Sequence, residues 1–450
     1  MKLPIEFEQN MKEMLGKDFD KYVDSLTKNA KKGVRVNKNY INPQKFKEIS
    51  NFALKDLLED NLFEIGQDKV GNTVFHHAGM IYVQEPSSML AVLALDVKNG
   101  EKILDLCSAP GGKSSQILEK NPDGIVVSNE IIRSRASVLF SNIERQGFKN
   151  SIITSLSPEK LAEIFPNYFD KILVDAPCSG EGMFRKDPKT IDEWNANLPL
   201  FNHERQLDIL KFADLMLKEN GAIVYSTCTF NQIENEQTVA EFCNNYGYEI
   251  QPLPNEILRV TIPAKNYHNQ NTSLCAKCFP FSNFGEGQFI SKLVKKSANL
   301  SIQNSKKNNK MQKIAQKDMV LCKQFLENTI GRDNFYFYKE GENIFLSEIE
   351  MPEISCGVIC KGVCLGIIKK DRVEPHHQFF KAYGKDFLNK IDLKSGDQEA
   401  ELYLKGNEIN CEGAQNGYVA ILFEGVPLGG GKVSAGKIKN HYPKGLRNNR

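Results

Sequence analysis

Nowhere in its 450 residues does the chain have the apolar run of roughly 18 to 20 residues that a membrane-spanning helix requires. Its first residues, MKLPIEFEQNMKEML, also lack the apolar core of a signal peptide. These two absences predict a cytoplasmic protein with no membrane partner. The net charge is only +2, so the charge total alone does not indicate a nucleic-acid partner, although local basic patches still can.

Two common nucleotide-binding signatures are also missing. The chain has no GxxxxGK[ST] segment, which excludes a Walker A phosphate loop, and no GxGxxG segment, which excludes the usual dinucleotide loop.

Acidic residues are absent from residues 295–317 and 429–450, and both segments are rich in lysine. We predict that the first is an exposed basic linker. The second lies near several aromatic residues, and we predict that it contacts RNA by its charges and by base stacking.

What the chain does have is a regular alternation of apolar strands and helices. Repeated strand–helix–strand units indicate a parallel sheet with helices on both faces. We therefore predict an α/β fold with a Rossmann-like, doubly wound sheet. Its strands are expected at residues 102–106, 124–129, 151–154, 171–175, 221–226 and 289–294, and its helices at residues 113–120, 133–146 and 200–217.

The regions that flank this alternation have a different character. Residues 4–30 predict one or two amphipathic helices, which begin a helical or α+β extension. Residues 28–38 are a basic stretch with a short strand, and they are either a solvated loop or a nucleic-acid contact. Residues 319–450 predict a small α+β domain with short strands and glycine-rich turns. A chain of this length exceeds one compact core, so we expect several domains.

A glycine-containing loop follows the first strand, in the segment DLCSAPGGKSS at residues 105–115. Gly111 and Gly112 allow a sharp turn and a close approach to a ligand, and the helix that begins near Lys113 points its amide groups at that ligand. The second strand ends at Glu130, eighteen residues after Gly112. A carboxylate at this place is well positioned to accept hydrogen bonds from two ribose hydroxyls. The pattern predicts a nucleoside-binding loop.

Two further loops each place a cysteine just beyond an apolar strand. They are KILVDAPCSGEG, with Asp175 and Cys178, and GAIVYSTCTF, with Cys228. Open α/β sheets bind their ligands at the carboxyl ends of the strands, so these side chains are expected to share one site. A thiolate is a strong nucleophile. Methylation at carbon 5 of a pyrimidine requires a nucleophile that adds to carbon 6, a carboxylate and a second helper group, and these three residues supply them.

These motifs resemble those of the RNA (cytosine-5) methyltransferases of the NOL/NOP/Sun family, and within it the bacterial RsmF-type 16S rRNA methyltransferases. DLCSAPGGK matches the family's S-adenosylmethionine loop, DAPCSGEG its aspartate and helper-cysteine motif, and STCTF its nucleophile motif. YVQEPSSM near the start and KNHYPKGLR at the end are also similar to this subgroup. The resemblance therefore covers nearly the whole chain.

The resemblance implies a role for each matching residue. Cys228 is the expected nucleophile, Cys178 assists product release, and Asp175 lies between cofactor and base. The expected S-adenosyl-L-methionine ligands are Cys107, Ser108, Ala109, Pro110, Gly111, Gly112, Lys113, Glu130, Arg135 and Asp175. The implied domains are an N-terminal RNA-facing domain at 1–95, a methyltransferase domain at 96–294, a basic linker at 295–318 and a PUA-like RNA-binding domain of α+β type at 319–450.

The sequence departs from the family pattern at three positions. Ser157 stands where many relatives carry an acidic or amide residue near the adenine, and Lys277 and Phe281 stand where the family often reads RxxPH. The pair Cys275 and Cys278 forms a CxxC, but no second pair accompanies it, so we predict no metal site.

We expect a monomer whose substrate is RNA, as 16S rRNA or the small ribosomal subunit. Two alternatives stay open: methylation of transfer RNA, and a ribosome assembly factor with an inactive methyltransferase fold. A nicotinamide-dependent oxidoreductase is disfavoured, because this chain lacks the GxGxxG motif and such a reaction would give the two cysteines no role.

Overall fold

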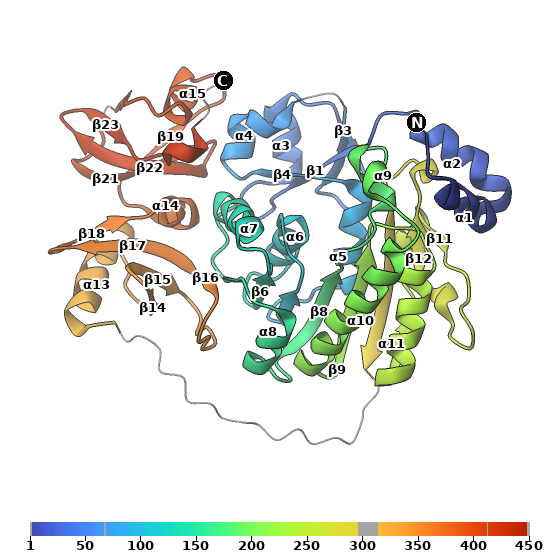
Figure 1. Ribbon diagram of the computed structural model, residues 1–450. Coiled ribbons are helices and arrows are strands. Elements are labelled where there is room, and N and C mark those ends of the chain that lie inside the picture. Colours follow the sequence, from blue (N-terminus) through green and yellow to red (C-terminus); the bar gives the residue numbers. More distant parts are fainter. Residues whose placement is uncertain (1, 67–68, 296–313, 412, 448–450) are drawn as a thin grey trace.

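The computed structural model describes residues 2–66, 69–295, 314–411 and 413–447 (Figure 1). Most of the predicted basic linker therefore lies outside the described residues. At the centre is a ten-stranded sheet with the strand order β11-β12-β13-β9-β8-β5-β6-β7-β16, and β10 pairs with β13. Its central strands, which pair in parallel, are β5 (Lys102–Asp105), β6 (Ile125–Asn129), β7 (Ser151–Thr154), β8 (Phe169–Asp175) and β9 (Leu217–Thr227).

The parallel strands are apolar because the sheet is covered on both faces. Leu104, Ile172, Leu173 and Val224 have no exposed surface. In one group of helices α5 contacts α6, which contacts α7, and in the other α8 contacts α10, which contacts α11. This arrangement confirms the predicted Rossmann-like, doubly wound α/β fold. The helices are α5 (Leu90–Leu95), α6 (Gly112–Lys120), α7 (Arg133–Arg145), α8 (Pro158–Ile164), α10 (Leu198–Met216) and α11 (Thr238–Tyr246).

The far edge of the sheet is antiparallel, since β13 (Gln288–Lys295) runs against β9. The remaining elements here are α9 (Lys189–Glu193), β10 (Tyr248–Gln251), α12 (Asn255–Leu258), β11 (Ile262–Pro263) and β12 (Ala276–Cys278).

The N-terminal region is an α+β unit that packs against helix α6, which covers one face of the central sheet. Its four-stranded antiparallel sheet has the order β2-β3-β1-β4, and β4 contacts α6. The elements are α1 (Ile5–Leu15), α2 (Phe19–Leu26), β1 (Lys32–Val36), α3 (Pro43–Ser50), β2 (Leu54–Asp56), β3 (Leu62–Ile65), α4 (Val74–His77) and β4 (Ile81–Gln84).

The C-terminal region contains two sheets. One has the order β14-β15-β17-β18, and the other, a curled PUA-like sheet, has the order β19-β21-β22-β23-β20. The elements are α13 (Gln316–Ile330), β14 (Tyr336–Glu340), β15 (Asn343–Ser347), β16 (Val358–Lys361), β17 (Val363–Lys369), β18 (Arg372–Pro375), α14 (His377–Tyr383), β19 (Lys390–Leu393), α15 (Gln398–Leu404), β20 (Ile409–Asn410), β21 (Gly417–Phe423), β22 (Val426–Ser434) and β23 (Lys437–Asn440).

The C-terminal region is joined to the rest of the molecule in two places. Strand β16 pairs with β7 and so extends the central sheet, with Cys360 opposite Ile153. The N-terminal sheet and the PUA-like sheet share one cluster of buried residues, which includes Phe63, Ile81 and Val419. Figure 1 shows the red PUA-like sheet beside the blue N-terminal elements. Within the described residues, no helix has the length and apolar character that a membrane crossing requires.

Candidate active site

A cavity of about 390 Å³ lies at the carboxyl ends of β5, β6, β8 and β9. Its volume falls within the range of ordinary ligand pockets. The lining includes many of the residues that the sequence singled out: Cys107, Ala109, Glu130, Arg135, Asp175, Cys178 and Cys228. Ser108, Pro110, Gly111, Gly112 and Lys113 are not part of this lining and lie behind it, in the loop and the first turn of α6.

The loop between β5 and α6 needs its two glycines. Gly111 has φ +108°, and a Cβ atom on it would approach Leu139 Cδ1 to 3.0 Å. A Cβ atom on Gly112 would lie 3.1 Å from Tyr82 Cε1, in the N-terminal sheet. Side chains at either position would push the loop out of place, so the turn depends on the absence of Cβ atoms.

Asp105, which ends β5, holds this loop from beneath. Its Oδ2 accepts a hydrogen bond from Ser114 Oγ at 2.6 Å, and its backbone carbonyl accepts one from Ser108 Oγ at 2.6 Å. Its Oδ1 is buried and has no hydrogen-bond partner among the described residues. Burial raises the pKa of this carboxyl to about 7. Asp105 therefore gains or loses a proton near neutral pH.

Glu130 brings a buried carboxylate to the edge of the cavity. Its Oε1 accepts a hydrogen bond from the backbone N–H of Ile132 at 3.0 Å, and its Oε2 lies 3.3 Å from Arg135 Nη1. Arg135 also donates to the backbone carbonyl of Ala109 at 3.2 Å. Arg135 thus ties the end of β6 to the loop after β5, and it fixes the direction of the Glu130 carboxylate.

Lys113 contacts Asp175 instead of lining the cavity. Its Nζ lies 2.7 Å from Asp175 Oδ2. The other carboxylate oxygen accepts hydrogen bonds from Ser226 Oγ at 2.7 Å and from Gln288 Nε2 at 3.2 Å. Burial is the largest influence on the pKa of Lys113 and lowers it, but the charge and hydrogen bond of Asp175, together with Asp105 and Cys228, outweigh burial and raise that pKa. Asp175 is consequently held by three neighbours at the wall of the cavity.

The two cysteine sulfurs are in contact. Cys178 Sγ and Cys228 Sγ are 3.2 Å apart, and the backbone N–H of Cys228 donates to Cys178 Sγ at 3.3 Å. Both side chains are half-buried and line the cavity. The hydrogen bond to Cys228 and burial raise the pKa of Cys178 well above its usual range. Cys178 therefore stays in its thiol form and can donate a hydrogen bond to the sulfur of Cys228.

Two buried carboxylates hold the cysteine loops together, and sequence reasoning gave them no role. Glu181 Oε2 accepts hydrogen bonds from the backbone N–H groups of Phe230 at 2.8 Å and Asn231 at 2.9 Å. Glu234 accepts from the backbone N–H of Ser179 at 3.0 Å and from the side chain of Asn231 at 2.7 Å. No local sequence signal could have found these contacts, because the partners of each glutamate lie in a different loop.

Lys277, which departs from the family's arginine, supports the same region. It is buried, its Nζ lies 2.7 Å from Glu236 Oε1, and it donates to the backbone carbonyl of Phe230 at 2.8 Å. Ser157 instead caps α8, since its Oγ accepts from the backbone N–H of Lys160 at 3.3 Å. Cys275 and Cys278 are buried and do not line the cavity.

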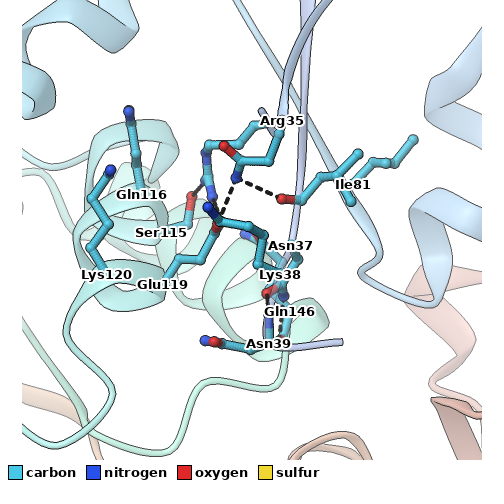
Figure 2. A network of polar contacts seen from close by, with 12 residues as sticks. Arg35, Asn37, Lys38, Asn39, Ile81, Ser115, Gln116, Glu119, Lys120 and Gln146 are labelled. Carbon is cyan, nitrogen blue, oxygen red and sulfur yellow. Dashed lines mark hydrogen bonds and ion pairs between the residues drawn. The ribbon is translucent and has the colours of Figure 1, made fainter. Parts of the chain in front are cut away.

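Arg35 joins the N-terminal sheet to the glycine loop (Figure 2). The sequence offered a solvated loop or a nucleic-acid contact for residues 28–38, and both are wrong for Arg35, which is 1% exposed. Its guanidinium pairs with Glu119 and donates to Ser115 Oγ at 2.6 Å, both on α6. Asn61 also donates to Glu119, at 2.6 Å. The helix that follows the glycine loop is thereby fixed to β1.

Comparisons with known families match three parts of the chain. Residues 92–294 match the family model of 16S rRNA methyltransferase RsmB/F. Residues 3–86 match the N-terminal domain of 16S rRNA methyltransferase RsmF, and residues 390–448 match the methyltransferase RsmF PUA domain.

Similar proteins are found among named relatives and among solved structures. Ribosomal RNA small subunit methyltransferase F of Aliivibrio salmonicida is 30% identical, over 84% of this chain and 81% of the relative. Its counterpart in Shewanella oneidensis is 28% identical, over 95% and 93%. A methyltransferase homologue from Pyrococcus horikoshii superimposes with a TM-score of 0.57 at 27% identity, over 64% of this chain and 93% of that one. NSun6 from the same organism, at 19% identity and a TM-score of 0.56, shares the fold over 65% of this chain and 98% of that one.

Proposed function

The chain belongs to the family of ribosomal RNA small subunit methyltransferase F, and we propose that Cys228, Cys178 and Asp175 carry out its chemistry. The enzyme is an S-adenosylmethionine-dependent methyltransferase that modifies carbon 5 of a cytosine in 16S rRNA. The observation that carries the proposed roles is the 3.2 Å contact between the two cysteine sulfurs, inside the cavity that also contains Asp175 and Glu130.

The residues around the cavity fit S-adenosylmethionine, which supplies an activated methyl group when bound. Gly111 and Gly112 allow the tight turn that brings Cys107 and Ala109 to the cavity, because a Cβ atom on either would crowd Leu139 or Tyr82. Glu130 presents a carboxylate whose direction is fixed by Arg135, and such a group suits two ribose hydroxyls. We assign the remaining residues of the glycine loop, 107–110, to the same ligand. Lys113 contributes to S-adenosylmethionine binding indirectly, by holding Asp175 in place.

Cys228 is the proposed nucleophile. Its sulfur adds to carbon 6 of the cytosine, and this addition makes carbon 5 nucleophilic enough to accept a methyl group. The Cys178 thiol lies 3.2 Å from Cys228 Sγ, and a hydrogen bond donated by this thiol stabilises negative charge on the attacking sulfur. The proton that the Cys228 thiol loses on attack is balanced by a proton taken up at ring nitrogen 3. We assign Asp175, which Lys113 holds in place, to accept hydrogen bonds from this new N–H and from the amino group of the cytosine.

Cys178 is the proposed base for the last step. Its pKa is raised first of all by the hydrogen bond to Cys228. Once Cys228 is bonded to carbon 6 this hydrogen bond is lost, and Cys178 releases its proton to the solvent. It can then take the proton from carbon 5, which allows Cys228 to leave. A flipped or unpaired cytosine is required, because a stacked base cannot reach Cys228.

We further propose that the enzyme acts as a cytoplasmic monomer, since one chain supplies every residue assigned to the cavity. The predicted division into residues 1–95, 96–294, 295–318 and 319–450 stands as a proposal for its domains. The N-terminal and C-terminal parts are then the regions that select the RNA. Transfer RNA and an inactive assembly role have no supporting observation.

Bisulfite sequencing of ribosomal and transfer RNA, from cells with and without the gene, tests the proposed reaction. We expect one or a few protected cytosines in 16S rRNA to be lost with the gene. They should return with a plasmid that carries the wild-type gene and stay lost with the Cys228→Ala gene. Restoration of the protected cytosines by Cys228→Ala would contradict the assignment of the nucleophile.

A further inference from the structure

Two features of the sequence have no role in the chemistry described above, and the fold brings them together. They are the basic residues around the end of α2 and Phe281, which replaces the histidine of the family's RxxPH motif. Both line a second cavity of about 510 Å³, between α2, residues 28–31 and residues 280–283. This cavity is separate from the one that contains the cysteines, with which it shares no lining residue.

The wall of this second cavity is connected to the nucleophile loop by stacked aromatic rings. Phe230, two residues after Cys228, stacks on Phe279 with ring centroids 4.6 Å apart and an angle of 18°. Phe279 stacks on Phe281 at 5.3 Å and 10°. Phe230 and Phe279 are buried, whereas Phe281 is half-buried and forms part of the cavity wall. The stack therefore ends in a ring that a further planar group can cover.

Four cationic side chains and one acidic side chain, Asp24, line the cavity. Lys31 and Arg185 are paired with Glu64 and Glu286 at positions that are largely buried, so Lys21 and Lys28 are the cations that can turn to an anion. Lys21 and Lys28 are exposed and pair with Asp18 at 2.8 Å and with Asp24 at 2.7 Å. Exposed pairs of this kind add little to stability, so both lysines can turn to a phosphate at small cost.

The cavity is also preformed. Arg185, one of its cationic side chains, is buried and bonded to Glu286 through two nitrogens, at 2.7 and 2.6 Å. It donates with its third nitrogen to the backbone carbonyl of Ser25, at 2.9 Å, and this bond fixes α2 against the core. A ligand that enters the cavity would therefore pay little to order its walls.

We propose that this second cavity binds an unpaired nucleotide of the RNA substrate that flanks the target cytosine. Its base lies against Phe281, and its phosphate lies between Lys21 and Lys28. An aromatic ring next to mobile cations suits a single-stranded nucleotide, because every base has a flat face and every nucleotide carries a phosphate. The inference rests on the proposed function, since it assumes that the chain methylates RNA.

Steady-state kinetics of the full chain with 16S rRNA from cells that lack the gene test this proposal. The RNA is offered as naked rRNA and as small subunits, and the form that the wild-type enzyme methylates is used. Phe281→Leu should raise KM for RNA by between about fivefold and about 150-fold, which is the range for loss of one stacked base. Its kcat and its KM for S-adenosylmethionine should not change. Phe281→Tyr, which keeps the ring, should resemble the wild type.

The lysines are tested by the salt dependence of RNA binding. Lys21→Gln/Lys28→Gln should reduce the slope of log K against log salt by about 0.7 for each lost phosphate contact. Lys12→Gln is the matched control, because it breaks a comparable exposed pair, with Glu8 at 2.6 Å, on the neighbouring helix and does not line the cavity. It should leave the slope unchanged.

The other outcomes would each overturn the inference. An unchanged KM for RNA in Phe281→Leu, beside an active wild type, would overturn it alone. A lower kcat with unchanged KM would do the same, because it would show that Phe281 only supports the nucleophile loop through Phe279. Failure of the wild-type chain to methylate either form of rRNA would overturn the proposed function, and this inference with it.

Discussion

Asp105 and Asp175 lie near each other, and their surroundings give them opposite properties. Asp175 has Lys113, Ser226 and Gln288 as partners, so it is well placed to act as an acceptor. Asp105 has one side-chain donor, Ser114, and one oxygen that has no partner among the described residues. Burial without compensation favours the neutral acid, and this explains why the pKa of Asp105 is raised to about 7.

This raised pKa predicts a pH-dependent stability. The folded chain holds the Asp105 proton more tightly than the unfolded chain, where the ordinary pKa is 3.8. The proton on Asp105 stabilises the folded chain fully below pH 3.8, and this stabilisation is lost as the pH rises through about 7. Between about pH 5 and about pH 7.5, the free energy of unfolding of the wild type should fall by roughly 3 kcal/mol relative to Asp105→Asn. Urea unfolding at both pH values measures this difference, and parallel profiles would contradict it.

At this scale the sequence predicts more about where residues lie than about what holds them. Cys178, Cys228 and Asp175 could be located because each follows an apolar strand whose end must face the ligand. The support from Glu181 could not be predicted, since its partners are backbone groups of Phe230 and Asn231, about fifty residues away in the sequence. No local pattern records a contact between two loops of this kind.

Strand β1 and helix α6 are joined by a buried ion pair. Arg35 and Glu119 are both almost fully buried, at 1% and 4% exposed side-chain surface. Burying two charges costs free energy, which their mutual attraction offsets only while both are present. The pair also holds the helix that carries the glycine loop, where Gly112 already packs against Tyr82.

Removing one partner of this pair should therefore cost more than removing both. Arg35→Met leaves Glu119 buried without its counter-charge, and the free energy of unfolding should fall by about 3–5 kcal/mol. Arg35→Met/Glu119→Leu should recover most of this loss, because Asn61 keeps its bond to the backbone carbonyl of Val36 at 2.9 Å. Urea unfolding of the wild type and the two variants measures these free energies of unfolding. A double variant as unstable as the single one would contradict the explanation.

The strands of the central sheet could be predicted because each contains a buried apolar run, and β7 was predicted at its observed bounds, Ser151–Thr154. Strand β9 begins at Leu217, four residues before the prediction, because Lys218, Glu219 and Asn220 extend it without being apolar. Strand β16 could not be assigned to this sheet. Its four residues, Val358–Lys361, carry no pattern that distinguishes an extension of the central sheet from a strand of a separate domain.

For the whole molecule, the C-terminal region is part of the structure that surrounds the methyltransferase sheet. It supplies β16 to the edge strand β7, and its PUA-like sheet shares a buried cluster with the N-terminal sheet. Lys381 of α14 donates to the backbone carbonyl of Ala78, just after α4, at 2.8 Å and also to that of Pro427 in β22, so one buried lysine joins the N-terminal region to the PUA-like sheet. An exposed edge strand without β16 would be open to pairing with other chains.

These contacts predict that the two halves associate without a covalent link. Residues 1–295 and 314–450, expressed together as separate polypeptides, should purify as a 1:1 complex. Residues 1–295 expressed alone should aggregate, because the edge of β7 and the apolar face of the N-terminal sheet are then uncovered. Size-exclusion chromatography with light scattering measures both results. Fragments that elute separately as soluble monomers would contradict the shared core.

The mechanism as a whole depends on a covalent bond between Cys228 and the RNA. The Cys178→Ala enzyme, incubated with 16S rRNA and S-adenosylmethionine, should accumulate a protein–RNA adduct that survives on a denaturing gel, because the proposed base for its release is missing. Cys178→Ala/Cys228→Ala should form no adduct. Free turnover by Cys178→Ala, or an adduct that persists without Cys228, would contradict the roles assigned to the two sulfurs.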